Sequence, residues 1–226
     1  MEELFQKRNF MKLIYAEGAC SLSVHILFEE LSVTYEAYKV DIKKNKDVLK
    51  EYNPKGYVPA LVIEDDQVLT EASAILQYVA DYYEAWHLVG AQGTFERIKC
   101  QEWLSYTSSE IHKTVAPLLT MKEKLSEGAQ NMFIAKVEER LGFVNEHLRD
   151  RAFLLEGLTI ADMYMIAILR IVEHAGVDLS QFSRLQSYKK KMELIPSVKA
   201  AIQEEKSSPL FSDRVHFNQT ERPLHS

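Results

Sequence analysis

The sequence has few of the features that mark secreted, membrane or nucleic-acid-binding proteins. Only two of its 226 residues are cysteines, Cys20 and Cys100, so a disulfide framework is not expected and a reducing compartment is. The longest apolar runs, such as 60–63 and 163–169, are far shorter than the roughly 18 residues of a membrane span. With 27 basic against 33 acidic residues, the net charge is −6, and no basic excess would attract nucleic acid or an anionic membrane.

The sequence also lacks the motifs of several common site types. Residues 1–18 are interrupted by charge and contain no apolar stretch before a small-residue cleavage site, so we expect a soluble, cytoplasmic protein. There is no His-Glu-x-x-His and no cluster of cysteine and histidine, so no metal is expected. A Walker loop and a Gly-x-Gly-x-x-Gly fingerprint are absent too, which argues against nucleotide binding.

Apolar residues make up 46% of the chain, enough to build a core, and the pattern changes along the sequence. Residues 1–90 hold 9 basic and 15 acidic side chains, whereas residues 91–226 hold 18 of each, so all the net charge lies in the first part. Up to about residue 70, short strand-like runs alternate with helical ones, and beyond about residue 94 only helical periodicity is found. We therefore predict an α/β domain followed by an all-α domain.

The first part predicts a βαβ unit followed by a hairpin and a helix. Strand candidates at 12–16 and 35–40 flank a helical pattern at 21–31, and a crossover of this length makes the two strands parallel. The remaining predicted elements are a short helix or loop at 43–52, strands at 60–64 and 67–69, and a helix at 70–84.

The second part predicts a bundle of helices. Thr159 and Asp162 have the spacing of a capping box, and the helix that follows is apolar nearly all round, as is typical of the buried centre of a domain. The other predicted helices are one long helix or two in sequence ending near Pro117, and helices at 133–148, 182–194 and 196–204.

Val58 and Pro59 lie between a turn and a strand, where the backbone has two possible conformations. A cis bond would turn the N–H and C=O of Val58 outward, leaving an edge able to pair with an extended peptide. A trans proline that simply starts the strand is the alternative.

Glu71 and Ala72 stand where the predicted hairpin meets a helix. The N–H groups at a helix start bind carboxylates, and Glu71 is placed to accept from an ammonium group, so together they match a free α-amino acid group. The alternative is a helix capped by Thr70 or Ser73 with nothing bound.

Cys20 follows a small-residue turn and precedes a helix, whose dipole is expected to lower the pKa of the thiol and favour the thiolate. Ser23 stands where a Cys-x-x-Cys motif carries its resolving thiol, so a mixed disulfide could form but not be released by an internal bridge. A small buried apolar residue is the alternative for Cys20, and Cys100 is interpreted as core packing.

A polar band interrupts the long helix pattern in the second part. His112 and Lys113 follow Ser105, Ser109 and Glu110, an arrangement that fits either a cleft or a solvated helix face.

Four motifs in order make the chain resemble the cytosolic glutathione transferases. They are the βαβ unit, Asn-Pro-x-Gly-x-Val-Pro-Ala-Leu from Asn53, Leu-Thr-Glu from Leu69 and the Thr-x-x-Asp box at Thr159. Residues 11–15 and 18–23 with His25, and residues 102–106 and 109–113, resemble the bacterial beta class in particular. The resemblance extends from about residue 11 to residue 209.

This resemblance implies a thioredoxin-like domain at 11–90 that binds glutathione and a helical domain at 94–209 that carries the site for a small hydrophobic electrophile. It also implies a homodimer, glutathione as co-substrate, and either conjugation of glutathione to electrophiles or thiol exchange with disulfides. Residues 1–10 and 210–226 are terminal extensions outside the resemblance.

The resemblance further implies roles for individual residues. Cys20 would lie against the glutathione sulfur, Val58 would pair with the cysteinyl backbone before a cis Pro59, and Lys43 or Lys44 would meet the glycyl carboxylate. The other implied glutathione-binding residues are Glu71, Ala72, Ser105, Ser109, Glu110, Ile111, His112 and Lys113.

Two positions depart from the family pattern. Ser105 stands where relatives usually carry asparagine, and the loop at 41–53 is shorter than expected, so Lys43 and Lys44 both remain candidates.

Two other functions fit the same fold: a catalytically silent interaction protein, and a glutathione-dependent isomerase or dehalogenase. The presence of Cys20, Val58, Glu71 and His112 together argues against a silent scaffold, which has no need of all four. Because the acidic excess lies in the part assigned to anionic glutathione, binding is expected to depend on local donors rather than on bulk charge.

Overall fold

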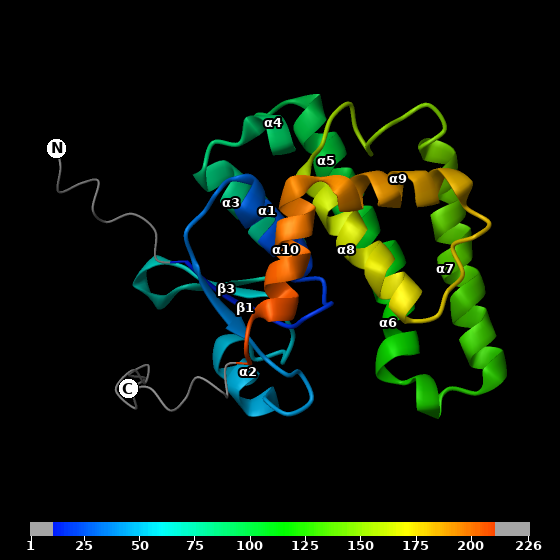
Figure 1. The fold of residues 1–226 in the computed structure, drawn as a ribbon, viewed down its shortest axis with the longest axis horizontal. Helices are drawn as coiled ribbons and strands as arrows, with labels where there is room; N and C mark the ends of the chain where they lie inside the picture. The colour runs from blue at the N-terminus through cyan, green and yellow to red at the C-terminus, as the bar shows by residue number, and fades with distance from the viewer. Residues whose placement is uncertain (1–10, 211–226) are drawn as a thin grey trace.

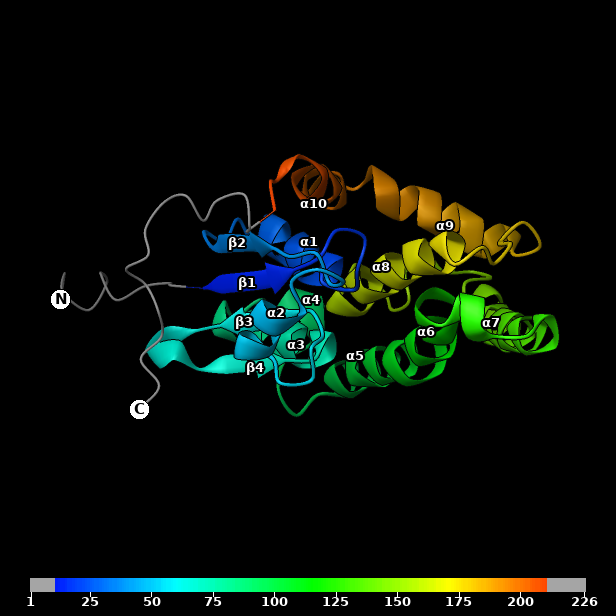
Figure 2. The ribbon, with the colours of Figure 1, turned by 90° about the horizontal axis from the view of Figure 1, so that it is seen from below.

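The computed structural model describes residues 11–210, and it has the predicted two-part architecture. A sheet with its helices occupies one side and a bundle of helices the other, as the two views in Figures 1 and 2 show. The predicted fold class, an α/β part followed by an all-α part, is confirmed. The terminal extensions predicted at 1–10 and 210–226 lie, apart from residue 210, outside the described residues.

The sheet has four strands in the order β2-β1-β3-β4. β1 and β2 pair in parallel and β3 and β4 pair antiparallel, so the βαβ unit and the hairpin are both confirmed. β3 runs antiparallel to β1, which joins the two units into one sheet. The strands are β1 (Lys12–Tyr15), β2 (Glu36–Lys39), β3 (Ala60–Val62) and β4 (Val68–Thr70), with a short 3₁₀ turn, η1 (Glu64–Asp66), in the hairpin.

Alternation along the strands gives the sheet two buried faces. Leu13 and Tyr15 face the main core, which includes α1 and α3, whereas Ile14 faces a smaller cluster with Leu49 of α2. A sheet covered on both faces explains why β1 is almost wholly apolar. The helices of this part are α1 (Leu22–Glu30), α2 (Lys46–Tyr52), α3 (Ala72–Tyr82) and α4 (Trp86–Val89).

In the second part, α8 is the central helix. Nearly every residue of α8 is buried, as the all-round apolar pattern predicts, and α8 packs against both α5 and α1. The elements of this part are α5 (Phe95–Tyr106), η2 (Thr107–His112), α6 (Lys113–Thr120), η3 (Lys122–Lys124), α7 (Glu127–His147), α8 (Ile160–His174), α9 (Ser183–Leu194) and α10 (Pro196–Ser207).

The segment around Pro117 differs from the prediction. The helix does not end near Pro117 but continues to Thr120, with the proline inside α6. The preceding segment η2 is a π-helix, which separates α5 from α6. Proline has no N–H to donate, and at the fifth position of α6 it removes only a bond near the start of that helix.

The capping box at the start of α8 is confirmed. The Asp162 carboxylate accepts from the Thr159 N–H at 2.9 Å and from the Thr159 hydroxyl at 2.8 Å. It also accepts from the Leu154 N–H at 2.8 Å and from the Tyr188 hydroxyl at 3.0 Å. One buried carboxylate therefore ties the preceding loop and α9 to the start of α8.

A bidentate ion pair joins the two parts where the chain passes from one to the other. The Arg97 guanidinium of α5 donates to the two oxygens of Asp81 on α3, at 2.6 and 2.7 Å. Gly90 lies in the loop between α4 and α5 and has φ of +79°. A Cβ at this position would lie 2.6 Å from the backbone nitrogen of Arg97. Only glycine allows α5 to approach this closely.

The last helix of the described residues, α10, returns to the first part and packs along α1, as Figure 1 shows. It therefore covers the sheet domain although it follows the helical domain in sequence. Among the residues that the structure describes, no helix is long and apolar enough to cross a membrane.

Candidate active site

The turn between β1 and α1 places Cys20 against the segment that enters β3. The Cys20 thiol contacts the Val58 carbonyl oxygen at 3.5 Å, and the Cys20 side chain is only 8% exposed. The Val58–Pro59 peptide bond is cis, so that prediction is confirmed and the trans alternative is wrong. Within residues 11–210 no hydrogen bond engages the Val58 N–H, which leaves a backbone donor beside the thiol.

The protonation state of Cys20 differs from the prediction. Burial, with smaller contributions from the Glu71 and Glu205 carboxylates, raises the pKa of the Cys20 thiol to about 12. The expected lowering by the α1 dipole is therefore wrong, because desolvation of the thiolate outweighs the dipole. Cys20 is a protonated thiol in this structure. Cys100 is fully buried, which confirms its assignment to the core.

Asn53 holds the segment that leads to Val58. Its side chain donates to the Tyr57 carbonyl at 2.7 Å and accepts from the Lys55 N–H at 3.1 Å. Its own carbonyl accepts from the Gly56 N–H at 2.7 Å, closing the predicted turn. Asn53 is buried, so these bonds fix the direction from which Val58 enters the site.

Glu71 is the N-cap of α3 and has φ of +70°, an uncommon conformation for a residue with a side chain. No side chain caps α3, so the alternative of a Thr70 or Ser73 cap is wrong. In the described part of the chain no acceptor engages the N–H groups of Ala72 and Ser73. The start of α3 thus offers free donors beside an exposed carboxylate.

Lys55 supplies a cation at this point that was not predicted. Its ammonium contacts the Glu71 carboxylate and donates to the Thr70 hydroxyl at 3.1 Å. The Lys55–Glu71 ion pair is largely exposed and contributes little to stability, so the ammonium group of a ligand can replace that of Lys55.

The helical part contributes a histidine paired with a tyrosine. His112 Nδ1 lies 3.0 Å from the Tyr164 hydroxyl of α8. Burial and the nearby Lys113 cation lower the pKa of His112, so its imidazole is neutral at neutral pH. Tyr164 is buried, and burial raises the pKa of its hydroxyl.

The predicted residues around His112 point in different directions. Ser105, Ser109 and Lys113 are exposed and lie four residues apart, so they share a helix face. Glu110 instead pairs with Arg140 of α7 at 3.2 Å, and Ile111 is fully buried in the core. The polar band is therefore a mixture of an accessible face and side chains engaged elsewhere.

Lys44, the remaining predicted residue, lies apart from these contacts. Its side chain is 81% exposed and its ammonium is 3.7 Å from the Asp41 carboxylate. Asp41 also accepts from the N–H groups of Lys43 and Lys44, which fixes the turn that carries both lysines.

Electrostatics connects the groups from the two parts. The Glu71 carboxylate acts on the pKa values of Cys20, His112 and Tyr164, and Cys20 itself acts on that of Tyr164. Since such effects fade with distance, these groups gather around one region between the sheet and α8.

Three site residues were missed in the sequence. Tyr164 lies in an apolar helix, and its hydroxyl could have indicated a polar contact there, because a buried hydroxyl needs a hydrogen-bond partner. Lys55 lies in the recognised turn but showed no pattern. Glu205 has a carboxylate 3.0 Å from the Gly18 N–H, and nothing local to α10 indicates that contact. Within residues 11–210, no three metal-ligating side chains cluster.

The comparisons with known proteins agree with this geometry. Residues 18–81 match the family model described as the glutathione S-transferase N-terminal domain. The glutathione S-transferase GstA of Escherichia coli O157:H7 is 34% identical over 200 residues, covering 86% of this chain and 98% of that protein.

Solved structures give the same result. A sphingomonad glutathione S-transferase complexed with glutathione is 32% identical, with a TM-score of 0.81, covering 87% of this chain and all of that one. The bacterial beta-class enzyme of Sphingomonas chungbukensis is 35% identical, with a TM-score of 0.80, covering 86% of this chain and 98% of that one. With the thiol, the cis proline and the open helix start in place, the chain belongs to the glutathione S-transferase family.

Proposed function

We propose that this glutathione transferase acts through Cys20, exchanging the thiol of glutathione with disulfides and also conjugating it to small hydrophobic electrophiles. The observation that carries the proposal is the position of the Cys20 thiol, which touches the Val58 carbonyl beside a free Val58 N–H. A peptide thiol that pairs with this backbone edge brings its sulfur to Cys20.

Glutathione binding follows from the open groups at the start of α3. The γ-glutamyl carboxylate fits the free N–H groups of Ala72 and Ser73, while its ammonium takes the place of the Lys55 ammonium on Glu71. Val58 holds the cysteinyl backbone. For the glycyl carboxylate, Lys44 is our candidate, with Lys43 as the alternative.

The helical part is assigned the outer side of the ligand. Ser105, Ser109, His112 and Lys113 are proposed to contact glutathione or the second substrate, and the exposed face that Ser105, Ser109 and Lys113 share supports this role. Glu110 and Ile111 had the same assignment, but their side chains are engaged by Arg140 and by the core. For these two we propose a supporting role in holding η2.

The exchange reaction needs no reagent besides glutathione and a disulfide. The Cys20 thiol loses its proton as its sulfur attacks one sulfur of the disulfide, that S–S bond breaks, and the departing thiolate takes up the proton that Cys20 released. Glutathione thiolate then attacks the mixed disulfide on Cys20, which restores Cys20 and releases the new disulfide. Ser23 stands where an internal resolving thiol would be, so the second thiol must come from glutathione.

Steady-state assays test the proposal. The protein should turn over glutathione with a small dialkyl disulfide and with an activated aryl halide. Cys20→Ala should abolish disulfide exchange while retaining binding to immobilised glutathione, because the ligand is held by backbone groups and Glu71. Cys100→Ala is the matched control and should keep the exchange activity. A folded protein that turns over neither substrate would contradict the proposal.

The wider assignments belong to the same proposal. Residues 11–90 form the glutathione-binding domain and residues 94–209 the domain with the electrophile site, in a cytoplasmic protein that acts in detoxification. The partner is a second copy of the chain. Large apolar side chains exposed on α5 and α7, Phe95, Ile98 and Phe143, support a homodimer.

A further inference from the structure

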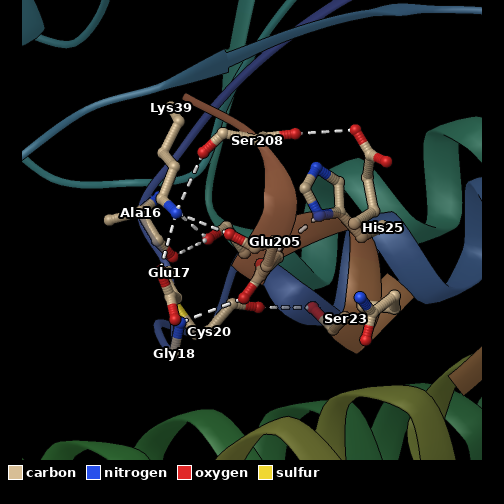
Figure 3. A network of polar contacts seen from close by, with 12 residues as sticks. Ala16, Glu17, Gly18, Cys20, Ser23, His25, Lys39, Glu205 and Ser208 are labelled. Atoms are coloured by element: carbon tan, nitrogen blue, oxygen red, sulfur yellow. Dashed lines mark hydrogen bonds and ion pairs between the residues drawn. The ribbon is translucent and has the colours of Figure 1, made fainter. Parts of the chain in front are cut away.

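The carboxylate of Glu205 is buried and takes no part in the chemistry described so far. It lies in the last turns of α10, on the side that faces the Cys20 turn, as Figure 3 shows. Glu205 is only 3% exposed, and a carboxylate at such depth persists only with partners. Its partners therefore indicate what it does.

The first partner is the turn that carries the thiol. Glu205 Oε2 accepts from the Gly18 N–H at 3.0 Å, and Gly18 stands two residues before Cys20. Gly18 has φ of +70°, the left-handed conformation that opens the turn toward α10. The second contact is with His25 of α1, which is fully buried: its Nδ1 lies 3.3 Å from Glu205 Oε1, although no hydrogen bond joins these two atoms.

A lysine from the sheet holds α10 at the same point. The Lys39 ammonium, at the end of β2, donates to the Glu205 carbonyl at 2.6 Å and to the Ser208 carbonyl at 3.2 Å. It also pairs with Glu17 at 2.6 Å, next to the Cys20 turn. A cation at a helix C-terminus is favourable, so Lys39 anchors the end of α10 where Glu205 reaches the turn.

Stability alone does not require this arrangement. A buried ionic contact is often no more stabilising than apolar packing of the same volume, and α10 already packs along α1 with apolar side chains such as Val198 and Ala201. The carboxylate instead fixes the position of the Cys20 turn, because it accepts a hydrogen bond from the Gly18 N–H in that turn.

We infer that Glu205 is a positioning residue for Cys20, and that α10 completes the active site by fixing the Gly18–Cys20 turn through this carboxylate. The catalytic consequence rests on the proposed function of Cys20, whereas the structural consequence, a thiol held in one place, does not. The negative charge has a separate effect: burial raises the pKa of the Cys20 thiol, and Glu205 adds a smaller contribution that raises it further.

The test compares substitutions at Glu205 with a control on the same helix. Glu205→Ala removes the carboxylate, Glu205→Asp keeps the charge but withdraws it by one methylene, and Glu205→Gln removes the charge but keeps an oxygen for the Gly18 N–H. The matched control is Ser197→Ala, which removes the 2.6 Å bond between α10 and Glu30 at the far end of α1.

Two readouts are measured on each variant: the rate of Cys20 carbamidomethylation, followed by peptide mass spectrometry across a pH series, and the kcat and KM of disulfide exchange. Glu205→Ala and Glu205→Asp should alkylate faster at Cys20 and lose about tenfold in kcat, because the thiol is no longer held in one position. Glu205→Gln should keep kcat while its alkylation profile moves to lower pH. Ser197→Ala should change neither readout.

The inference is overturned if the Glu205 variants match Ser197→Ala in both readouts. If Glu205→Ala does not fold, Glu205→Asp and Glu205→Gln decide the question by the same criteria. Alkylation at Cys20 requires no turnover, so a protein without exchange activity would refute the proposed function and still test the positioning role.

Discussion

At the scale of single residues, the protonated Cys20 thiol sets the pH behaviour of the site. A pKa near 12 leaves only about one thiolate in 10⁴ molecules at pH 8, against about a quarter for an ordinary cysteine. Because the folded pKa is raised, reactivity should increase with pH well beyond the range in which free cysteine is fully ionised.

Iodoacetamide labelling checks this expectation. Without glutathione, Cys20 should react at pH 8 far more slowly than free cysteine, and its rate should still be rising at pH 10. In urea-unfolded protein the rate should return to that of an ordinary thiol. A labelling midpoint below pH 8 in the folded protein would refute a buried, protonated Cys20.

Tyr164 permits a second residue-level prediction. Tyr164→Phe removes the hydroxyl that meets His112 Nδ1 and should lower kcat/KM by about tenfold, equivalent to one hydrogen bond of roughly 1.4 kcal/mol. The midpoint of the pH profile assigned to His112 should shift as well, because its partner is lost.

Tyr106→Phe is the control for Tyr164→Phe. The Tyr106 hydroxyl donates to the Arg140 carbonyl at 3.1 Å, away from His112, so its removal is the same chemical change at another place. Equal kinetic effects and equal pH profiles for the two variants would show that Tyr164 has only a packing role.

Among single residues, those with a local or family signal could be predicted from the sequence, whereas those defined by tertiary contacts could not. The cis bond at Pro59 and the core position of Cys100 were predicted, because the relevant signals are local or carried by the family pattern. The Cys20 pKa was not predicted, since it depends on burial, and burial depends on tertiary contacts such as the one between the thiol and the Val58 segment. Lys55 and Glu205 act through contacts that no local pattern encodes.

At the scale of elements, the start of α8 offers a stability prediction. Asp162→Ala removes a buried acceptor shared by three residues and should lower the free energy of unfolding by about 2–4 kcal/mol. Chemical denaturation monitored by circular dichroism measures this loss.

Asp178→Ala is the control for Asp162→Ala. Among the residues that the structure describes, the Asp178 carboxylate accepts only from Ser180 in an exposed turn, so its loss should leave the free energy of unfolding unchanged. If the two variants unfold alike, the capping box is not a determinant of stability.

Elements differ in how well the sequence specified them. The apolar α8 was predicted almost in full, and α7 was predicted from its seventh residue onward, because periodicity over several turns is a strong signal. The α5–η2–α6 segment was predicted less well, because a π-helix keeps the composition of an α-helix and Pro117 was interpreted as an end. That segment carries His112, so the least regular part of the bundle contributes to the site.

At the scale of the whole molecule, the exposed apolar side chains predict self-association. Phe95 is 74% exposed, and Ile98, one turn further along α5, is 54% exposed. Adjacent large apolar side chains in contact with water are typical of a protein–protein interface. Phe95→Asp with Ile98→Glu should convert a dimer into a monomer in sedimentation velocity, since each substitution would place a charge in the interface.

Leu194→Glu is the matched control for the two α5 substitutions. Leu194 is 67% exposed at the end of α9, outside α5 and α7, so Leu194→Glu should leave the sedimentation coefficient unchanged. A monomer at all concentrations for the unaltered protein would contradict the homodimer.

The return of α10 to α1 has a consequence for synthesis on the ribosome. The Gly18 amide and the Glu205 carboxylate are 187 residues apart in sequence, so the turn beside Cys20 meets its partner only after almost the whole chain has emerged. The sheet domain can form its strands much earlier, because their contacts are closer in sequence. A nascent chain that does not yet extend through α10 therefore presents the thiol without the Glu205 contact that holds its turn.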